Sequence, residues 1–236
     1  MKIATMHRCR GDSVQYVKGR KKNVGFTPDI IYITTLFTFH YKIVIKTILF
    51  YKKYFSNSDL KVGGIFASLM PEFIKKHTGV ECHFGLLPET EDCIPDYETI
   101  PSDCSIVFTS RGCTNKCRFC VVPKIEGTLT DIENWNEDIN ASKRLITFWD
   151  NNWFAKGYDL IKRDVTRIKS FLDIGVETFD FNQGLDARLF TEAIAKLLHG
   201  MPLHPIRFAF DNMSEDGYVQ KALTLARKYN FYEQNY

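Results

Sequence analysis

Three cysteines lie close together near the middle of this 236-residue chain, at Cys113, Cys117 and Cys120. Thiolates at short, fixed spacing are typical ligands of an iron–sulfur cluster or a zinc ion. A [4Fe–4S] cubane has one more iron than this loop has thiolates, so one iron would keep an open position. An open iron can bind a cosubstrate, much as a catalytic zinc keeps a position for water. The C-x3-C-x2-C spacing therefore predicts a cluster that takes part in chemistry.

Other uses of these three cysteines stay open at the level of sequence. A zinc site would need a fourth ligand, which Cys104, Cys93 or His83 could supply after folding. One of the same residues could instead close a cluster that only carries electrons. The three cysteines could also be reduced thiols without a ligand.

The composition predicts a globular cytoplasmic protein. Hydrophobic residues make up 44% of the chain and charged residues 25%, enough for one large domain or two smaller ones. The seven cysteines are an odd number, and no continuous apolar segment follows Met1, so we do not expect a secreted disulfide scaffold. The most hydrophobic stretch, from Asp29 to Phe55, is interrupted by His40, Lys42 and Lys46. We therefore expect no membrane partner.

The first half of the chain alternates between strand and helix patterns. We predict strands from Ile30 to Thr35 and from Asp59 to Gly64. Between them we predict a helix with four residues on one apolar face: Val44, Ile48, Tyr51 and Phe55. A strand, a crossover helix and a second strand indicate a parallel α/β sheet. A boundary between two domains, 1–100 and 101–236, is expected near the prolines Pro95 and Pro101.

The second half repeats the same alternation four times. The predicted strands cover residues 106–108, 144–152, 177–183 and 206–210, and the predicted helices cover residues 158–172, 191–198 and 217–229, with Thr191 as an N-cap. Successive β/α units are the pattern of a barrel or a partial barrel. In such folds the chemistry gathers at the carboxyl ends of the strands.

The cysteine loop, Phe119 before its last cysteine and the strand-like segment 105–110 together resemble the radical S-adenosylmethionine (SAM) superfamily. Pro123 and Gly127 resemble the continuation found in methylthiotransferase-like and cobalamin-domain-associated members. The resemblance implies that the three cysteines bind a [4Fe–4S] cluster and that SAM chelates the open iron. It also implies reductive cleavage of SAM to a 5′-deoxyadenosyl radical that acts on an unknown substrate.

This resemblance also implies the fold class. It is α/β, with a Rossmann-like, cobalamin-binding-like domain at 1–100 and a partial (β/α) radical SAM barrel at 101–236. The family's D-x-H-x-x-G cobalamin signature is absent, so we expect a degenerate domain and no cobalamin. The family's Gly-Gly-Glu is replaced by the segment from Trp149 to Trp153. Only 131 residues follow Ser105, room for about four β/α units, so we expect a truncated barrel.

Polar residues at the predicted strand ends are suited to the ammonium, carboxylate and ribose of SAM. The predicted cofactor-binding residues are Phe119, Asp150, Asn182, Gln183, Arg188 and Asp211. Phe119 would lie on the adenine side, and Asp150 is the first candidate for the SAM ammonium. The competing explanation is local, because Asp and Asn also favour turns that cap helices. No catalytic acid or base is assigned.

The partners follow from the same resemblance and from one basic cluster. A reductant such as flavodoxin or ferredoxin is implied for the cluster. The run from Lys18 to Lys22 holds four basic residues around a glycine and could contact the phosphates of a nucleic acid, although a solvated turn is the simpler interpretation. No convincing pattern of stacking aromatic residues lies near it in sequence. The competing function is a non-catalytic iron–sulfur or zinc protein, or a partner subunit.

Overall fold

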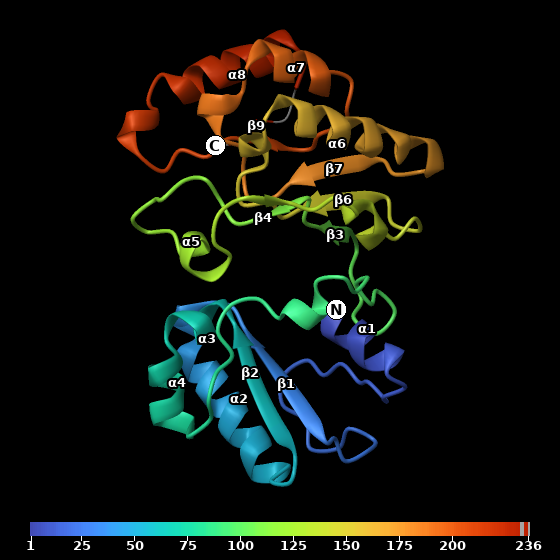
Figure 1. Cartoon of the computed structure of the whole chain (residues 1–236), viewed down its shortest axis with the longest axis vertical. Coiled ribbons are helices and arrows are strands. Elements are labelled where there is room, and N and C mark those ends of the chain that lie inside the picture. The colour runs from blue at the N-terminus through green and yellow to red at the C-terminus, as the bar shows by residue number, and fades with distance from the viewer. Residues whose placement is uncertain (232–233, 236) are drawn as a thin grey trace. The chain divides into compact units, whose positions relative to one another are not determined.

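The computed structural model describes residues 1–231 and 234–235, which form two compact units (Figure 1). Unit 1 comprises Met1–Ile100 and Lys124–Glu126, and unit 2 comprises Pro101–Pro123 and the chain from Gly127 onward. Each unit has a hydrophobic core of its own. Among the described residues, no helix combines the length and the apolar character that a membrane crossing would need.

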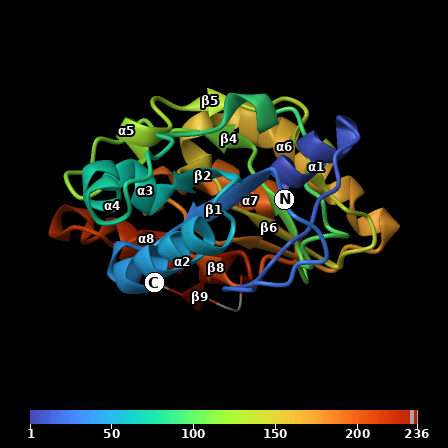
Figure 2. The same cartoon turned by 90° about the horizontal axis from the view of Figure 1, so that it is seen from below.

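Unit 1 is a small parallel sheet with helices. In chain order it contains α1 (Lys2–Cys9), β1 (Ile30–Thr35), α2 (Tyr41–Tyr54), β2 (Asp59–Gly64), α3 (Ile65–Leu69) and α4 (Pro71–Thr78). The two strands pair in parallel, from Ile30 opposite Asp59 to Thr35 opposite Gly64. Helix α2 lies along this two-stranded sheet (Figures 1 and 2). Its apolar face buries Ile48 against Val62 and Phe66 in the core of the unit.

The two glycines at the end of β2 have a structural explanation. Gly64 has φ +100°, and a Cβ atom there would lie 2.2 Å from the carbonyl oxygen of Thr35. The Thr35 hydroxyl donates to the Gly63 carbonyl at 2.9 Å and accepts from the Ala67 amide at 2.9 Å. Gly64 therefore permits a tight strand-to-helix turn against the neighbouring strand, whereas a Cβ atom at Gly63 would meet only the His83 Cβ at 3.7 Å.

Unit 2 is a larger parallel β/α assembly. Its elements are β3 (Ser105–Val107), β4 (Ser110–Arg111), β5 (Thr130–Asp131), β6 (Leu145–Phe148), α6 (Tyr158–Ser170), β7 (Thr178–Phe181), α7 (Glu192–Leu198), β8 (Ile206–Arg207), α8 (Tyr218–Lys228) and β9 (Gln234–Asn235). The short helix α5 (Val122–Ile125) begins in unit 2 and ends in the segment that belongs to unit 1. Strands β3, β6 and β7 form one parallel sheet in that order. Helices α6, α7 and α8 gather on one side of β6 and β7 (Figure 1).

The parallel arrangement continues beyond β7. Phe179 forms an isolated parallel bridge with Leu203, and β8 pairs in parallel with β9. The segment at β9 therefore occupies the place of a fifth strand. Large apolar side chains form the core beneath these strands, among them Ile146, Phe148 and Phe179, which are at most 1% exposed.

The predicted α/β class and the parallel sheets are confirmed, and most predicted elements are present. Strands β1 and β2 have the predicted bounds, and Thr191 caps α7 by accepting from the Ile194 amide at 3.4 Å. Strand β8 is shorter than the predicted segment 206–210. Beyond Arg207, Phe208 makes only an isolated bridge to Leu185, and the Asp211 amide donates to the Glu215 side chain rather than to a neighbouring strand. The identity of unit 1 as a cobalamin-binding-like domain stays a prediction.

We predict that Gly64→Ala destabilises the protein by about 3 kcal/mol or more, because a backbone conformation reserved for glycine and a clash with Thr35 act together. Urea unfolding followed by circular dichroism measures the loss. Gly63→Ala is the matched control, since its Cβ would meet only the His83 Cβ at an ordinary 3.7 Å. Equal effects of the two substitutions would contradict this explanation.

Candidate functional site

The three cysteines lie in a loop whose two ends are held together by a short antiparallel ladder. In this ladder Ser110 of β4 lies opposite Asp131 of β5, and Arg111 lies opposite Thr130. The Ile132 amide adds a hydrogen bond to the Thr109 carbonyl at 2.9 Å. The ladder closes residues 112–129 into a loop, and β4 begins three residues after β3 ends. The cysteines are therefore placed at the carboxyl end of the parallel sheet.

Gly112 makes the first turn of this loop. Its φ is +70°, and a Cβ atom would lie 2.2 Å from the carbonyl oxygen of Thr128 on the returning side of the loop. The next residue, Cys113, donates its amide to the Gly127 carbonyl at 3.3 Å. A glycine is required here because the two sides of the loop approach too closely for any side chain.

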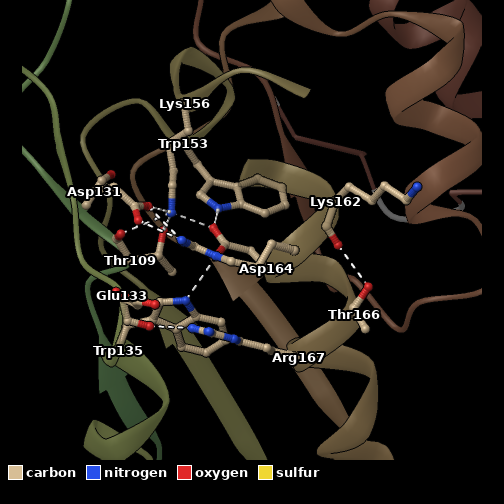
Figure 3. A network of polar contacts seen from close by, with 12 residues as sticks. Thr109, Asp131, Glu133, Trp135, Trp153, Lys156, Lys162, Asp164, Thr166 and Arg167 are labelled. Atoms are coloured by element: carbon tan, nitrogen blue, oxygen red, sulfur yellow. Dashed lines mark hydrogen bonds and ion pairs between the residues drawn. The ribbon is translucent and has the colours of Figure 1, made fainter. Parts of the chain in front are cut away.

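A buried ammonium group holds the chain on both sides of the cysteine loop (Figure 3). The Lys156 side chain is 0% exposed, and its Nζ lies 2.5 Å from Asp164 Oδ2 and 2.7 Å from Asp131 Oδ1. The same Nζ donates to the carbonyl and the hydroxyl of Thr109, at 3.0 and 2.9 Å. Thr109 precedes the loop and Asp131 follows it, so one cation fixes both ends.

Asp164 is the buried counter-charge of this network (Figure 3). It accepts from the indole N–H groups of Trp135 and Trp153, each at 3.1 Å, and from Arg163 at 2.9 Å. Arg163 also forms two 2.8 Å bonds to the carboxylate of Asp131. Burial alone would raise the pKa of Asp131, but the bonds from Arg163 and Lys156 outweigh it and lower that pKa. Buried charges are tolerated here because each is paired and hydrogen-bonded.

Asp150, our first candidate for the SAM ammonium, has other partners in the structure. Its buried carboxylate accepts from the Thr109 amide and hydroxyl, at 3.2 and 2.8 Å, and from the Ser110 hydroxyl at 2.6 Å. Burial raises its pKa, although these hydrogen bonds oppose the rise. Asp150 therefore fixes the chain just before the cysteine loop. Its assignment as a SAM ligand stays a prediction that no contact supports.

The three thiols lie near one another and are free. Burial raises the pKa of Cys117, and the neighbouring Cys120 and Cys113 raise it further because like charges would repel. Within the described part of the chain, no three His, Cys, Asp or Glu side chains converge as ligands of a single metal ion. A cubane cluster does not require such convergence, since each thiolate binds a different iron. Free thiols on one anchored loop fit the donor set of a cluster.

Asp186 links the cysteine loop to the strand ends. Its carboxylate accepts from Asn115 at 3.3 Å, from Asn152 at 3.1 Å and from Arg188 at 2.7 and 2.6 Å. Burial alone would raise the pKa of Asp186, but these donors, led by Arg188, lower it. Asn115 lies between the first two cysteines, so this carboxylate positions the loop from within.

Asp186 is absent from the cofactor-binding residues predicted from sequence, and so is Asn152. One feature of the sequence could have indicated Asp186: it lies two residues before Arg188, a spacing that permits an ion pair within one turn. Asn152 is 4% exposed, and its Oδ1 is buried without a hydrogen-bond partner among the described residues. A buried acceptor of this kind is suited to a ligand hydroxyl or ammonium group.

The remaining predicted cofactor-binding residues are exposed. Phe119 is 70% exposed, and Asn182 and Gln183 follow the end of β7 on the surface. Arg188 lowers the pKa of Cys117 and Asp211 raises it, so both charges lie within electrostatic range of that thiol. The structure thus brings Arg188 and Asp211 to the cysteine loop. It shows no contact that tests a cofactor-binding role for any of these five residues, so all five assignments stay predictions.

Comparisons with known proteins find similarity in structure alone. No family model matches the sequence, and no curated protein matches it. Two solved structures of TsrM, a radical SAM methyltransferase from Kitasatospora setae, superpose with TM-scores of 0.67 at 12% and 13% sequence identity. One contains cobalamin and a [4Fe–4S] cluster, and the other contains tryptophan substrate and a SAM analogue. Each match covers 89% of this chain but only 58% and 56% of TsrM. At this identity the match shows the fold.

We predict that Lys156→Met destabilises the protein by about 3–5 kcal/mol, because Asp164 keeps a buried charge without its main counter-ion. Thermal and urea unfolding of the substituted chain measure the loss. Lys162→Met on the following helix α6 is the control, since Lys162 is exposed and its replacement should change stability by less than about 0.5 kcal/mol. A Lys156→Met protein as stable as this control would show that the network does not hold the fold.

Proposed function

We propose that this chain binds a [4Fe–4S] cluster through Cys113, Cys117 and Cys120 and cleaves SAM reductively at the open iron. The observation that carries the proposal is the anchored loop of three free thiols at the carboxyl end of a parallel sheet. In β/α folds this end is where chemistry is found. The similarity of the fold to that of a radical SAM methyltransferase supports the same reading.

A cluster bound here would supply one electron to the SAM sulfonium, and carbon–sulfur cleavage would release methionine and a 5′-deoxyadenosyl radical. The chain's own residues prepare that site. Burial and the neighbouring thiols raise the pKa of Cys117, and the nearby positive charge of Arg188 opposes that rise. The unpartnered Oδ1 of Asn152 would accept from the SAM ammonium or ribose, and exposed Phe119 offers an apolar surface to the adenine.

Cobalamin does not form part of this proposal. It is bound by TsrM, whereas in unit 1 the carbonyl oxygen of Thr35 lies 2.2 Å from where a Cβ atom of Gly64 would be. His7, a conceivable cobalt ligand, is bonded to Asp12 at 2.7 Å and to Tyr32 at 2.9 Å. The absence of cobalamin from this protein stays a prediction.

The competing proposal is a cluster or a zinc ion without catalysis. Low-temperature electron paramagnetic resonance of the reconstituted, dithionite-reduced protein, with and without SAM, separates the two. A [4Fe–4S] signal that shifts when SAM is added supports the open iron, and formation of 5′-deoxyadenosine supports cleavage. A signal indifferent to SAM supports an electron carrier, and bound zinc without a cluster overturns the proposal.

We predict that Cys113→Ser, Cys117→Ser and Cys120→Ser each abolish the cluster, because every thiolate binds its own iron. Iron analysis after anaerobic reconstitution should fall from about four atoms per chain to a small fraction of that value. Cys9→Ser is the control, since Cys9 is exposed and lies on α1, and it should retain full iron content. Loss of iron in the control equal to that in the loop variants would disprove the assignment.

We predict that Asp186→Ala leaves a cluster in place but weakens SAM binding roughly tenfold, because Arg188 and Asn152 lose the acceptor that orients them. The measurement is the SAM concentration that gives half of the spectral shift, recorded with iron content. Asp186→Asn keeps an oxygen acceptor and should recover part of the affinity. Asp173→Ala, an exposed aspartate in the same unit, should have no effect. An unchanged SAM titration in Asp186→Ala would exclude a positioning role.

A further inference from the structure

Positive charge is concentrated in one stretch of unit 1. Residues 16–55 contain eight Lys or Arg residues and a single Asp, a formal charge of +7, whereas the whole chain carries +3. The rest of the chain is therefore net negative. A separation of charge of this size raises the local potential far above what the net charge indicates.

The fold docks the basic loop from Lys18 to Lys22 onto the end of α2. The Tyr51 hydroxyl donates to the Gly19 carbonyl at 2.9 Å and accepts from the Lys21 amide at 3.4 Å. Tyr51 is 7% exposed, so this contact is anchored in the core of the unit. The loop is consequently held by its backbone while its charged side chains lie in solvent.

An aromatic ring lies among these charges. Tyr54 is 43% exposed, and the Nζ atoms of Lys22 and Lys53 lie 4.1 and 5.6 Å from its ring centroid. The sequence alone did not predict this aromatic neighbour, because more than thirty residues separate the loop from Tyr54. An exposed ring beside lysines combines a stacking surface with phosphate contacts.

The cations around this ring are not neutralised within the protein. We call the following residues the basic patch: Lys18, Arg20, Lys21, Lys22, Lys46, Lys53 and Tyr54. In the described ranges 1–231 and 234–235, none of its six cations forms an ion pair with a carboxylate. Lys46 and Lys53 are seven residues apart on α2, so they share one face over about 10 Å.

We propose that the basic patch binds single-stranded nucleic acid, with phosphates on its lysines and arginine and a base stacked on Tyr54. Release of counterions from the nucleic acid would contribute favourable free energy to binding. Stacking on Tyr54 would accept any base, because every base has a flat aromatic face. An anionic membrane fits less well, because the loop from Lys18 to Lys22 contains no apolar side chain to insert. This binding does not depend on the cluster.

Fluorescence anisotropy of a labelled single-stranded RNA of mixed sequence, titrated with the full chain over a range of salt concentrations, tests the proposal. The triple variant Arg20→Gln/Lys21→Gln/Lys22→Gln should lose at least about tenfold in affinity, and the slope of log K against log salt should fall by about 2. The control Lys76→Gln/Lys162→Gln/Lys221→Gln removes the same charge from exposed lysines outside the patch and should change affinity less than about twofold.

Stacking has a separate test. Tyr54→Ala should weaken RNA binding about fivefold or more, whereas Tyr54→Phe keeps the ring and should bind within about twofold of the unchanged protein. Circular dichroism confirms that each variant is folded. The proposal is overturned if the unchanged chain does not bind the RNA, or if both triple variants weaken binding equally. Binding to phosphatidylserine vesicles without binding to RNA would assign the patch to membranes instead.

Discussion

The buried ammonium of Lys156 is the constraint on which the candidate site depends. It has no exposed surface, so Asp164, Asp131 and Thr109 must replace the water that would otherwise surround it. Thr109 and Asp131 stand on either side of the cysteine loop, and neither can move away without taking a hydrogen bond or an ion pair from the buried ammonium. The two ends of an otherwise irregular loop are thereby held in place. Three ligands of one cluster require such a fixed arrangement.

Asp186 fixes the interior of the cysteine loop, whereas Lys156 fixes its two ends. By accepting from Asn115, Asn152 and Arg188 it connects the cysteine segment with the ends of two strands. Among the described residues, the buried Oδ1 of Asn152 in this network has no hydrogen-bond partner. The hydrogen bond from the Asn152 amide to Asp186 holds this side chain in place, so a ligand that bound it would pay little ordering entropy.

The two units carry different physical features. Unit 2 has the anchored thiols and the parallel sheet, and its proposed chemistry is that of a cluster and SAM. Unit 1 has a sheet of two strands and a concentration of lysine around Tyr54, which points to a polyanion. The similarity to TsrM extends over 89% of this chain, yet the match leaves substrate and reaction product to experiment because identity is 12%.

The sequence by itself determined the alternation of strands and helices and singled out the three cysteines as the candidate chemical centre, because periodicity and ligand spacing are local properties. It also predicted Arg188 and Asp211 as cofactor-binding residues, since polar residues follow parallel strands to one edge of a sheet. Only the tertiary structure decided that Asp150 is enclosed by Thr109 and Ser110, and that Asp186 and Asn152 face the loop. Such pairings join residues 34 to 71 positions apart, and no local pattern encodes which partner a buried carboxylate will find.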